Sequence, residues 1–257
     1  DSIRTWQMFK WKNMPNPQLP LVPETTDPWY TPQAAIDNFR LSSKNHVDVP
    51  VSVHSTTLHI VAAHPTPPVF DGAEDRNGRR NADEVRLLQA IINDESWLVD
   101  DAGATGGLSA GSSFVVCGDL NADALDGDGN RTVIQGLLND PLIKQEVSNG
   151  NMLPTSAGGA ATTHDTYTGP RDRITASWGL RVDYVLPSSN LAVTASSIVW
   201  PAAGEDLADN MSASDHFMLY VDLEMSDSEE ASGCQRTTVE GLFGVTAALT
   251  ALALAVS

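Results

Sequence analysis

Short apolar runs mark the strands expected in this chain. Residues 58–63 (LHIVAA) form such a run and end at His64-Pro65, a pattern typical of a strand buried on both faces. Further apolar runs predict strands at 114–117, 180–186 and 217–223, and a candidate strand at 197–200. These runs are separated by glycine- and serine-rich loops, so we expect several short strands.

Helical spacing appears in two other places. In the segment 81–99 the apolar residues repeat on one helix face, and Asn81 stands where an N-cap is expected, with Glu84 three residues later. A shorter helix is predicted at 131–138. Repeated prolines make 15–32 an extended loop without a helix. Strands mixed with helices, with no internal repeat, indicate an α/β or α+β fold.

Composition and charge narrow the classes of function. With 257 residues the chain is long enough for a large buried core. Its formal net charge of −18 disfavours a protein that holds nucleic acid in a broad basic groove. An enzyme whose bound divalent cations supply local positive charge remains compatible with this composition. The two cysteines are too few for a disulfide framework.

Polar side chains gather at the ends of the predicted strands. His64 follows the first, Gly118-Asp119-Leu120-Asn121 closes the second, and Ser214-Asp215-His216 precedes the last. Asp183 lies within an apolar strand, where a carboxylate is costly to bury unless it is paired, and a histidine is its natural partner. Carboxylates and histidines on one rim can bind a hard cation, orient a water molecule and stabilise charge on a phosphoryl oxygen.

Taken in order, these four motifs, with Arg181-Val182-Asp183-Tyr184 as the third, resemble the endonuclease/exonuclease/phosphatase superfamily. The segments HPTPPVFDGAEDRNGRRNADEVRLL and LRVDYVLPS look especially like a secreted or surface-attached branch of it. The resemblance covers residues 1–225. It implies a deoxyribonuclease I-like fold, in which two mixed sheets form a sandwich flanked by helices. It also implies cleavage of phosphate esters with Mg²⁺, or with Mn²⁺ or Ca²⁺ in its place.

The resemblance also assigns roles to the rim residues. His64 would hydrogen-bond or polarise the phosphate, and Asp119 would orient the attacking water or bind the metal ion. Asn121 would donate to the phosphate and hold Asp119 in place, and Asp215 would be a second metal ligand. These roles fit an in-line displacement, which needs an activated water on one side of phosphorus and neutralised charge on the other.

Two further pairs of residues complete the expected site. By the resemblance, Asp183 would orient His216, which would act as a base or as a donor to the charge developing on phosphorus. Arg80 and Asn81 stand at the expected start of a helix, where side chains and the helix N-terminus can reach a substrate phosphate. A capped, solvated helix start explains that second pair equally well.

One part of the superfamily pattern is missing. It opens with a strand ending in Asn, followed by a strand ending in Glu, and the sequence shows neither before residue 58. Asn13 and Glu24 are the early candidates, and both fall near or in the proline-rich stretch. We therefore expect Asp1 to lie inside the domain, which makes the chain either a partial domain or a degenerate protein. An incomplete domain would leave an open sheet edge.

The last residues differ from the rest. We divide the chain into a partial catalytic domain at 1–225, a polar linker at 226–240 and an uncharged hydrophobic tail at 241–257. Small residues at 231–233 followed by a polar stretch and this tail resemble a lipid-anchor addition signal. A C-terminal membrane tail and an ordinary docking helix are the alternatives. We expect a monomer that is extracellular or attached to the cell surface.

The sequence thus favours a metal-dependent phosphoesterase, with an extracellular nuclease acting on DNA or RNA as the first interpretation. A phosphomonoesterase, or a phospholipid or inositol-phosphate phosphodiesterase, is the alternative within the same class. A non-catalytic surface protein that retains the fold is the alternative from another class.

Overall fold

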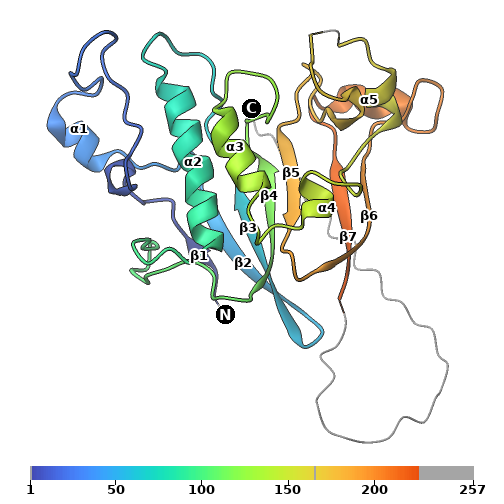
Figure 1. Ribbon diagram of the computed structural model, residues 1–257, viewed down its shortest axis with the longest axis horizontal. Coiled ribbons are helices and arrows are strands. Elements are labelled where there is room, and N and C mark those ends of the chain that lie inside the picture. Colours follow the sequence, from blue (N-terminus) through green and yellow to red (C-terminus); the bar gives the residue numbers. More distant parts are fainter. Residues whose placement is uncertain (1, 165, 226–257) are drawn as a thin grey trace, which may run out of the picture.

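The computed structural model describes residues 2–164 and 166–225, which form two β-sheets with helices packed outside them (Figure 1). The larger sheet has the strand order β1-β2-β3-β4-β5 and the smaller one pairs β6 with β7. The strands are β1 (Arg4–Thr5), β2 (His46–Val53), β3 (Thr56–Ala63), β4 (Ser113–Asp119), β5 (Asp183–Pro187), β6 (Ala192–Ile198) and β7 (Leu219–Glu224). This two-sheet, helix-flanked architecture confirms the predicted fold class.

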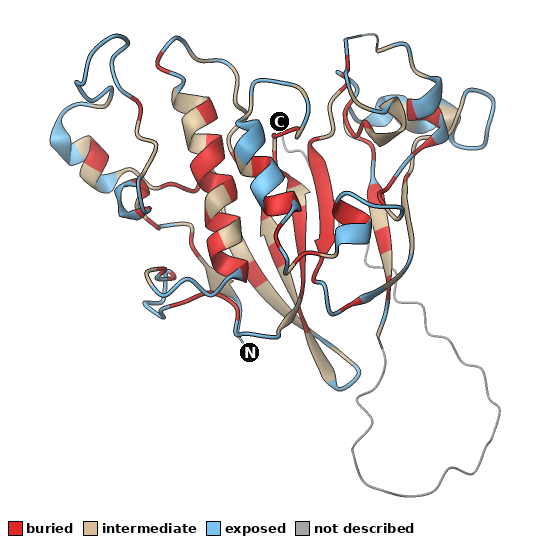
Figure 2. Cartoon of the chain, in the orientation of Figure 1, coloured by how far each residue is buried: buried red, intermediate tan, exposed pale blue. Residues whose placement is uncertain are grey.

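The helices lie mainly on one side of the larger sheet. The longest is α2 (Arg76–Ile92), which connects β3 to its parallel neighbour β4 and turns its buried face toward the sheet (Figure 2). The others are α1 (Gln33–Asn38), α3 (Arg131–Leu138), α4 (Gln145–Ser148) and α5 (Ala157–Ala161), with 3₁₀ turns η1 (Trp11–Asn13), η2 (Arg171–Arg173) and η3 (Ala208–Ala213). None of the helices in the described part is long and apolar enough to cross a membrane.

The central strands bury both faces, as their apolar runs predict. Along β3, Val61 belongs to the core beneath α2, whereas Leu58 belongs to a second core between the two sheets. On β4, Val116 and Val115 divide in the same way. Alternate side chains of a strand point to opposite faces, so only strands covered on both sides need such continuous runs.

Two strands of the larger sheet, the two-residue β1 and the longer β2, have no apolar run and are absent from the sequence prediction. In β2 (HVDVPVSV) polar residues alternate with valines, and Pro50 interrupts the pattern. β1 pairs only with Val47 and Asp48, so β2 is an edge strand at Pro50, where a proline is tolerated. Three predicted strands are shifted. β5 begins at Asp183 rather than at residue 180, β7 begins at Leu219 rather than at residue 217, and β6 spans Ala192–Ile198 where the candidate strand was 197–200.

The start of α2 corrects the sequence prediction. The helix begins at Arg76 after Asp75 and ends at Ile92, so Asn81 is an interior helical residue and not the N-cap. Asn81 is buried, and its side-chain amide donates to the carbonyl oxygens of Thr66 and Leu120, at 2.9 Å each. It thereby joins the loop after β3 to the loop after β4. By contrast, α3 spans the predicted residues.

Glu84, one turn along the same helix, binds two loops as well. Its fully buried carboxylate accepts the backbone N–H and the hydroxyl of Ser43, at 2.6 and 2.7 Å, and the N–H of Thr66 at 2.6 Å. Ser43 precedes β2 and Thr66 follows β3. Asn81 and Glu84 together fix three loops at one end of the larger sheet.

Several predictions concern residues outside the described part of the chain or near its beginning. The linker at 226–240 and the tail at 241–257 lie outside the described residues, so their assignment stays a prediction. Asn13 ends the 3₁₀ turn η1 and Glu24 lies in a turn, both exposed. Residues 15–32 form turns without a helix, as expected.

Replacing Asn81 tests the link between the loops. Asn81→Ala is expected to lower the free energy of unfolding by about 1–3 kcal/mol, because the buried carbonyls of Thr66 and Leu120 lose their donor. Denaturant unfolding followed by tryptophan fluorescence measures the change. The matched control Asn38→Ala, on exposed helix α1, is expected to cost less than about 0.5 kcal/mol. Equal losses in the two variants would contradict the assigned role.

Candidate active site

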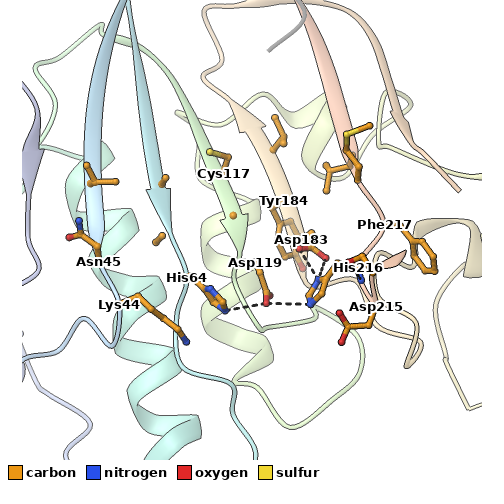
Figure 3. A pocket seen from close by; sticks show the side chains of 18 of the residues that line it. Lys44, Asn45, His64, Cys117, Asp119, Asp183, Tyr184, Asp215, His216 and Phe217 are labelled. Carbon is orange, nitrogen blue, oxygen red and sulfur yellow. Dashed lines mark hydrogen bonds and ion pairs between the residues drawn. The ribbon is translucent and has the colours of Figure 1, made fainter. Parts of the chain in front are cut away.

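The polar residues singled out at strand ends meet at one end of the larger sheet (Figure 3). β3 and β4 are parallel, so His64 after β3 and Asp119 at the end of β4 lie at the same edge. β5 runs antiparallel to β4, which places its first residue, Asp183, directly opposite Asp119. His216 precedes β7 and bridges to Ala176 in the segment before β5. The predicted common rim is therefore present.

These side chains line a pocket of about 650 Å³ between the two sheets. One end of it is polar and carries Lys44, His64, Asp119, Asp183, Asp215 and His216. The wall toward the strands is apolar and is formed by residues such as Val47, Ala62, Val185, Phe217 and Leu219. A ligand in this pocket would meet charged groups at one end and hydrocarbon at the other.

Asp183 and His216 form the ion pair that the sequence predicts. The Nδ1 atom of His216 lies 2.9 and 3.1 Å from the two carboxylate oxygens of Asp183. A carboxylate only accepts hydrogen bonds, so Nδ1 carries a proton and Nε2 faces the pocket. The hydrogen bond to Asp183 raises the pKa of His216, against the opposing effect of burial. Asp183 itself is 3% exposed, so the pair also satisfies a buried charge.

Asp119 lies between the two histidines. Its Oδ2 atom is 3.4 Å from Nε2 of His64 and 3.9 Å from Nε2 of His216, and its Oδ1 accepts the backbone N–H of Asn121 at 2.8 Å. Burial, and then the nearby charge of Asp183, raise the pKa of Asp119 to about 6. A carboxyl group with this pKa can exchange a proton near neutral pH.

The two histidines respond to the pocket in opposite directions. Burial lowers the pKa of His64, and the positive charges of Lys44 and His216 lower it further. Compared with a free imidazole, the pocket therefore favours the neutral form of His64 and the protonated form of His216. The two rings approach the same carboxylate oxygen of Asp119. Groups whose environments separate their pKa values in this way are suited to distinct roles in proton transfer.

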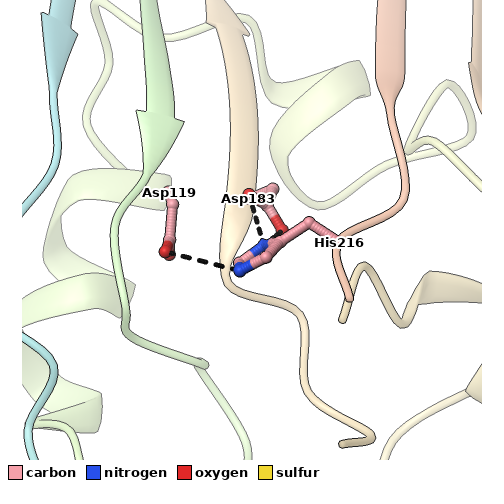
Figure 4. A group of neighbouring side chains, drawn as sticks. All are labelled: Asp119, Asp183 and His216. Carbon is pink, nitrogen blue, oxygen red and sulfur yellow. Dashed lines mark hydrogen bonds and ion pairs between the residues drawn. The ribbon is translucent and has the colours of Figure 1, made fainter. Parts of the chain in front are cut away.

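The donor set fits a hard divalent cation. Asp119, Asp183 and His216 each offer one ligand atom, and these atoms lie within 4.8 Å of one another (Figure 4). Mg²⁺ needs only one or two protein carboxylates and completes its shell with water and substrate phosphate. Asp183 is already engaged with His216, which leaves Asp119 as the available carboxylate of this group. Asp215 is exposed and lines the same pocket outside the group of three, so its role as a ligand stays a prediction.

Three predicted substrate contacts have other partners in the structure. Asn81 is buried and held by Thr66 and Leu120, and the guanidinium of Arg80 donates to the carbonyl oxygens of Leu41 and Arg40. Both are outside the pocket lining and are held by protein carbonyls, so their role as substrate-binding residues stays a prediction.

Asn121 is placed differently from its prediction as well. Its side-chain amide donates to the carbonyl of Pro65 at 3.0 Å, and it holds Asp119 through its backbone N–H, at a left-handed φ of 51°. It supports Asp119 as expected, whereas its contact with phosphate stays a prediction.

The structure adds two residues that the sequence prediction lacks. Lys44 lines the polar end of the pocket just before β2, and it was missed together with that strand. Trp178 is 48% exposed, and its ring meets that of His216 edge to face at 4.9 Å between centroids. Nothing in the local pattern marks Trp178, because its proximity arises from the bridge between Ala176 and His216.

The variant Asp119→Asn tests whether the ionised carboxylate of Asp119 destabilises the metal-free protein. Its folded-state pKa lies above the usual 3.8, so the stability linked to its protonated form is present below about 4 and is lost as pH rises through about 6. In metal-free protein Asp119→Asn is therefore expected to be more stable than the wild type at pH 8, by about 1–3 kcal/mol, and equal to it near pH 4. Thermal unfolding with chelator present measures this. Mg²⁺ should raise Tm only in the wild type; a less stable variant at pH 8 would contradict this account.

Comparison with known proteins identifies a family for this chain. The sequence model of the Endonuclease/Exonuclease/phosphatase family matches residues 15–216. A search of curated proteins gave no significant match. Among solved structures, the chain is similar to an endonuclease/exonuclease/phosphatase family protein from Leptotrichia buccalis, with 17% identity and a TM-score of 0.41 over 73% of this chain and 56% of that one.

Two further solved structures are similar at comparable levels. Sphingomyelinase C from Streptomyces griseocarneus has 14% identity and a TM-score of 0.36, over 64% of this chain and 48% of that one. Beta toxin from Staphylococcus aureus, with bound magnesium ions, has 11% identity and a TM-score of 0.41, over 72% of this chain and 59% of that one. The chain thus spans about half the length of these proteins.

The matched range begins before β2 and ends at His216, so it includes every strand end that lines the polar part of the pocket. The chain belongs to the endonuclease/exonuclease/phosphatase family, whose members are metal-dependent hydrolases of phosphate esters.

Proposed function

We propose that this protein hydrolyses phosphodiester bonds with the help of a divalent cation. The observation that carries the proposal is the Asp183–His216 pair, with the carboxylate of Asp119 3.9 Å from the other imidazole nitrogen of His216. Hydrolysis of a phosphate ester needs a group that accepts a proton from water and a group that donates to the phosphoryl oxygen or leaving group. The pocket holds candidates for both within one polar cluster.

The chain's own residues would share the reaction as follows. Asp119 orients the attacking water and accepts its proton at Oδ2, the carboxylate oxygen that lies between His64 and His216. His216, held by Asp183 and protonated at Nδ1, donates from Nε2 toward the charge that develops on phosphorus. His64, favoured as the neutral form, hydrogen-bonds a phosphoryl oxygen.

A divalent cation held by Asp119 and Asp215 would neutralise charge on the phosphoryl oxygens. Mg²⁺ is the first candidate, and Mn²⁺ and Ca²⁺ favour the same oxygen ligands. Water and the substrate itself would supply the remaining ligands.

Nucleic acid is the first substrate to test. The exposed indole of Trp178, next to His216, offers a surface on which a base can stack. The net charge of −18 opposes the long-range attraction of a polyanion, so affinity would depend on the cation and on contacts near the scissile bond.

A second candidate substrate is favoured by the apolar wall of the pocket. Val47, Val185 and Leu219 continue directly from the polar end. A phospholipid or another phosphodiester with an apolar substituent would place that group against this wall. Nucleic acid has no comparably apolar part.

Hydrolysis assays test the proposal. The protein is expected to cleave bis-p-nitrophenyl phosphate with Mg²⁺ or Mn²⁺, and chelator should abolish cleavage. Parallel assays with plasmid DNA, phosphatidylcholine micelles and p-nitrophenyl phosphate distinguish a nuclease, a phospholipid phosphodiesterase and a phosphomonoesterase. A folded protein inactive on all four substrates with either cation would favour a non-catalytic protein that retains the fold.

Location and assembly are further proposals. We propose that the protein is extracellular or bound to the cell surface, on the basis of the sequence at 226–257 alone, and that it is a monomer. Fractionation of cells that express the full chain tests the location, and light scattering tests the monomer.

His216 carries the sharpest prediction for activity. His216→Ala is expected to lower kcat on the preferred diester by about 10²–10⁴-fold, the usual contribution of a general acid or base. The matched control His54→Ala changes an exposed histidine between β2 and β3, at the opposite end of these strands, and should retain wild-type turnover. Normal turnover in a folded His216→Ala protein would refute the mechanism.

A further inference from the structure

The four lysines of the chain are not equivalent. Lys12 forms an ion pair with Asp37 at 2.8 Å, Lys10 donates to the carbonyl of Asn38 at 3.1 Å, and Lys144 donates to the carbonyl of Ser189 at 3.4 Å. Each of these ammonium groups therefore has a partner on the protein. Among the residues that the structure describes, the ammonium group of Lys44 has no hydrogen bond or ion pair.

The backbone around Lys44 is well fixed, although its side chain is exposed. The preceding residue, Ser43, is held twice by the buried carboxylate of Glu84, and the carbonyl of Lys44 accepts the side-chain amide of Gln7 at 3.1 Å. Lys44 lines the pocket together with His64, and both side chains are drawn in Figure 3. The fixed backbone thus places a positive charge in the pocket, and no carboxylate in the described part of the chain forms an ion pair with it.

That charge acts on the site. Lys44 is the one lysine or arginine among the described residues that line this pocket. After burial, its charge is the next cause that lowers the pKa of His64, and it partly opposes the rise in the pKa of Asp119, so its field reaches both groups. Asp119, Asp183 and Asp215 occupy the other side of the same polar end. The pocket is thus divided into a side with one unpaired cation and a side with three carboxylates.

A phosphate ester matches this division of charge. Its negative oxygens need positive partners, and the three carboxylates can contribute to binding them only through a bound cation. A lysine ammonium group is a compact point charge that can follow a phosphoryl oxygen on its flexible stem.

We propose that Lys44 binds a non-bridging oxygen of the substrate phosphate, on the side of the pocket opposite Asp119 and Asp215. This inference rests on the proposed function, because it takes a phosphate ester as the ligand. It assigns Lys44 to substrate binding, together with His64 of the same pocket.

Binding of inorganic phosphate tests this without any need for turnover. Lysines dimethylated with ¹³C-formaldehyde keep their charge and give separate NMR signals, and single Lys→Arg variants assign the four side chains. On titration with inorganic phosphate, with and without Mg²⁺, the Lys44 signal is expected to shift and saturate. The signals of Lys10, Lys12 and Lys144 should remain in place. Equal small shifts in all four lysines, or none at Lys44 under either condition, would overturn the proposal.

Kinetics on bis-p-nitrophenyl phosphate give a second readout. Lys44→Met is expected to lower kcat/KM by about 10- to 100-fold, the usual loss for a hydrogen bond to a charged group, mainly through KM. Lys44→Arg should recover most of the loss because it keeps the charge, and the control Lys144→Met should match the wild type. If Lys44→Met matches the wild type, the inference fails although the enzyme is active.

The two experiments separate the inference from the proposed function. A protein that hydrolyses none of the diesters but still binds phosphate at Lys44 would retain the binding site and lose the proposed function.

Discussion

The site depends on two polar side chains that α2 buries beneath the larger sheet's rim. Asn81 and Glu84 would each be costly to bury alone, so both must find partners, and the nearest unpaired backbone groups belong to the loops that carry the site. Satisfying them fixes the segment before β2, the loop after β3 and the loop after β4 relative to one helix. The positions of Lys44, His64 and Asp119 follow from this arrangement. The helix face that completes the core therefore also orders the rim, and stability and site geometry have a common origin.

A second constraint is the concentration of negative charge. Asp119 and Asp183 face each other across β4 and β5, and burial makes their ionised forms costly. Asp183 is compensated by His216, whereas Asp119 has no equally close positively charged partner among the described residues, so burial and the charge of Asp183 raise its pKa. A bound cation would remove this cost. The unfavourable environment of the Asp119 carboxylate is thus consistent with a function that uses a bound cation. The same cation makes an acidic chain compatible with phosphate-ester chemistry.

Sequence patterns predicted the strands that are covered on both faces and the charged residues and histidines at the strand ends. β3 and β4 have apolar runs because both faces are covered, and His64, Asp119, Asp183 and His216 meet because strand ends share a rim. The search for apolar runs failed for β2, in which polar and apolar residues alternate. β2 is an edge strand with alternating polarity and a proline, so it was missed, and Lys44 with it. Asn81 has the residue type of an N-cap, and only its tertiary partners, Thr66 and Leu120, show that it belongs to the helix interior.

The central claim is that the carboxylates of this rim hold a divalent cation. The most direct test is a crystal of the protein grown with Mn²⁺, with data collected at the manganese absorption edge. The account predicts an anomalous peak within coordination distance of the Asp119 carboxylate, in the pocket between the two sheets, and loss of that peak in Asp119→Asn. A peak confined to other acidic surfaces, or an ordered pocket without manganese at saturating concentration, would contradict it.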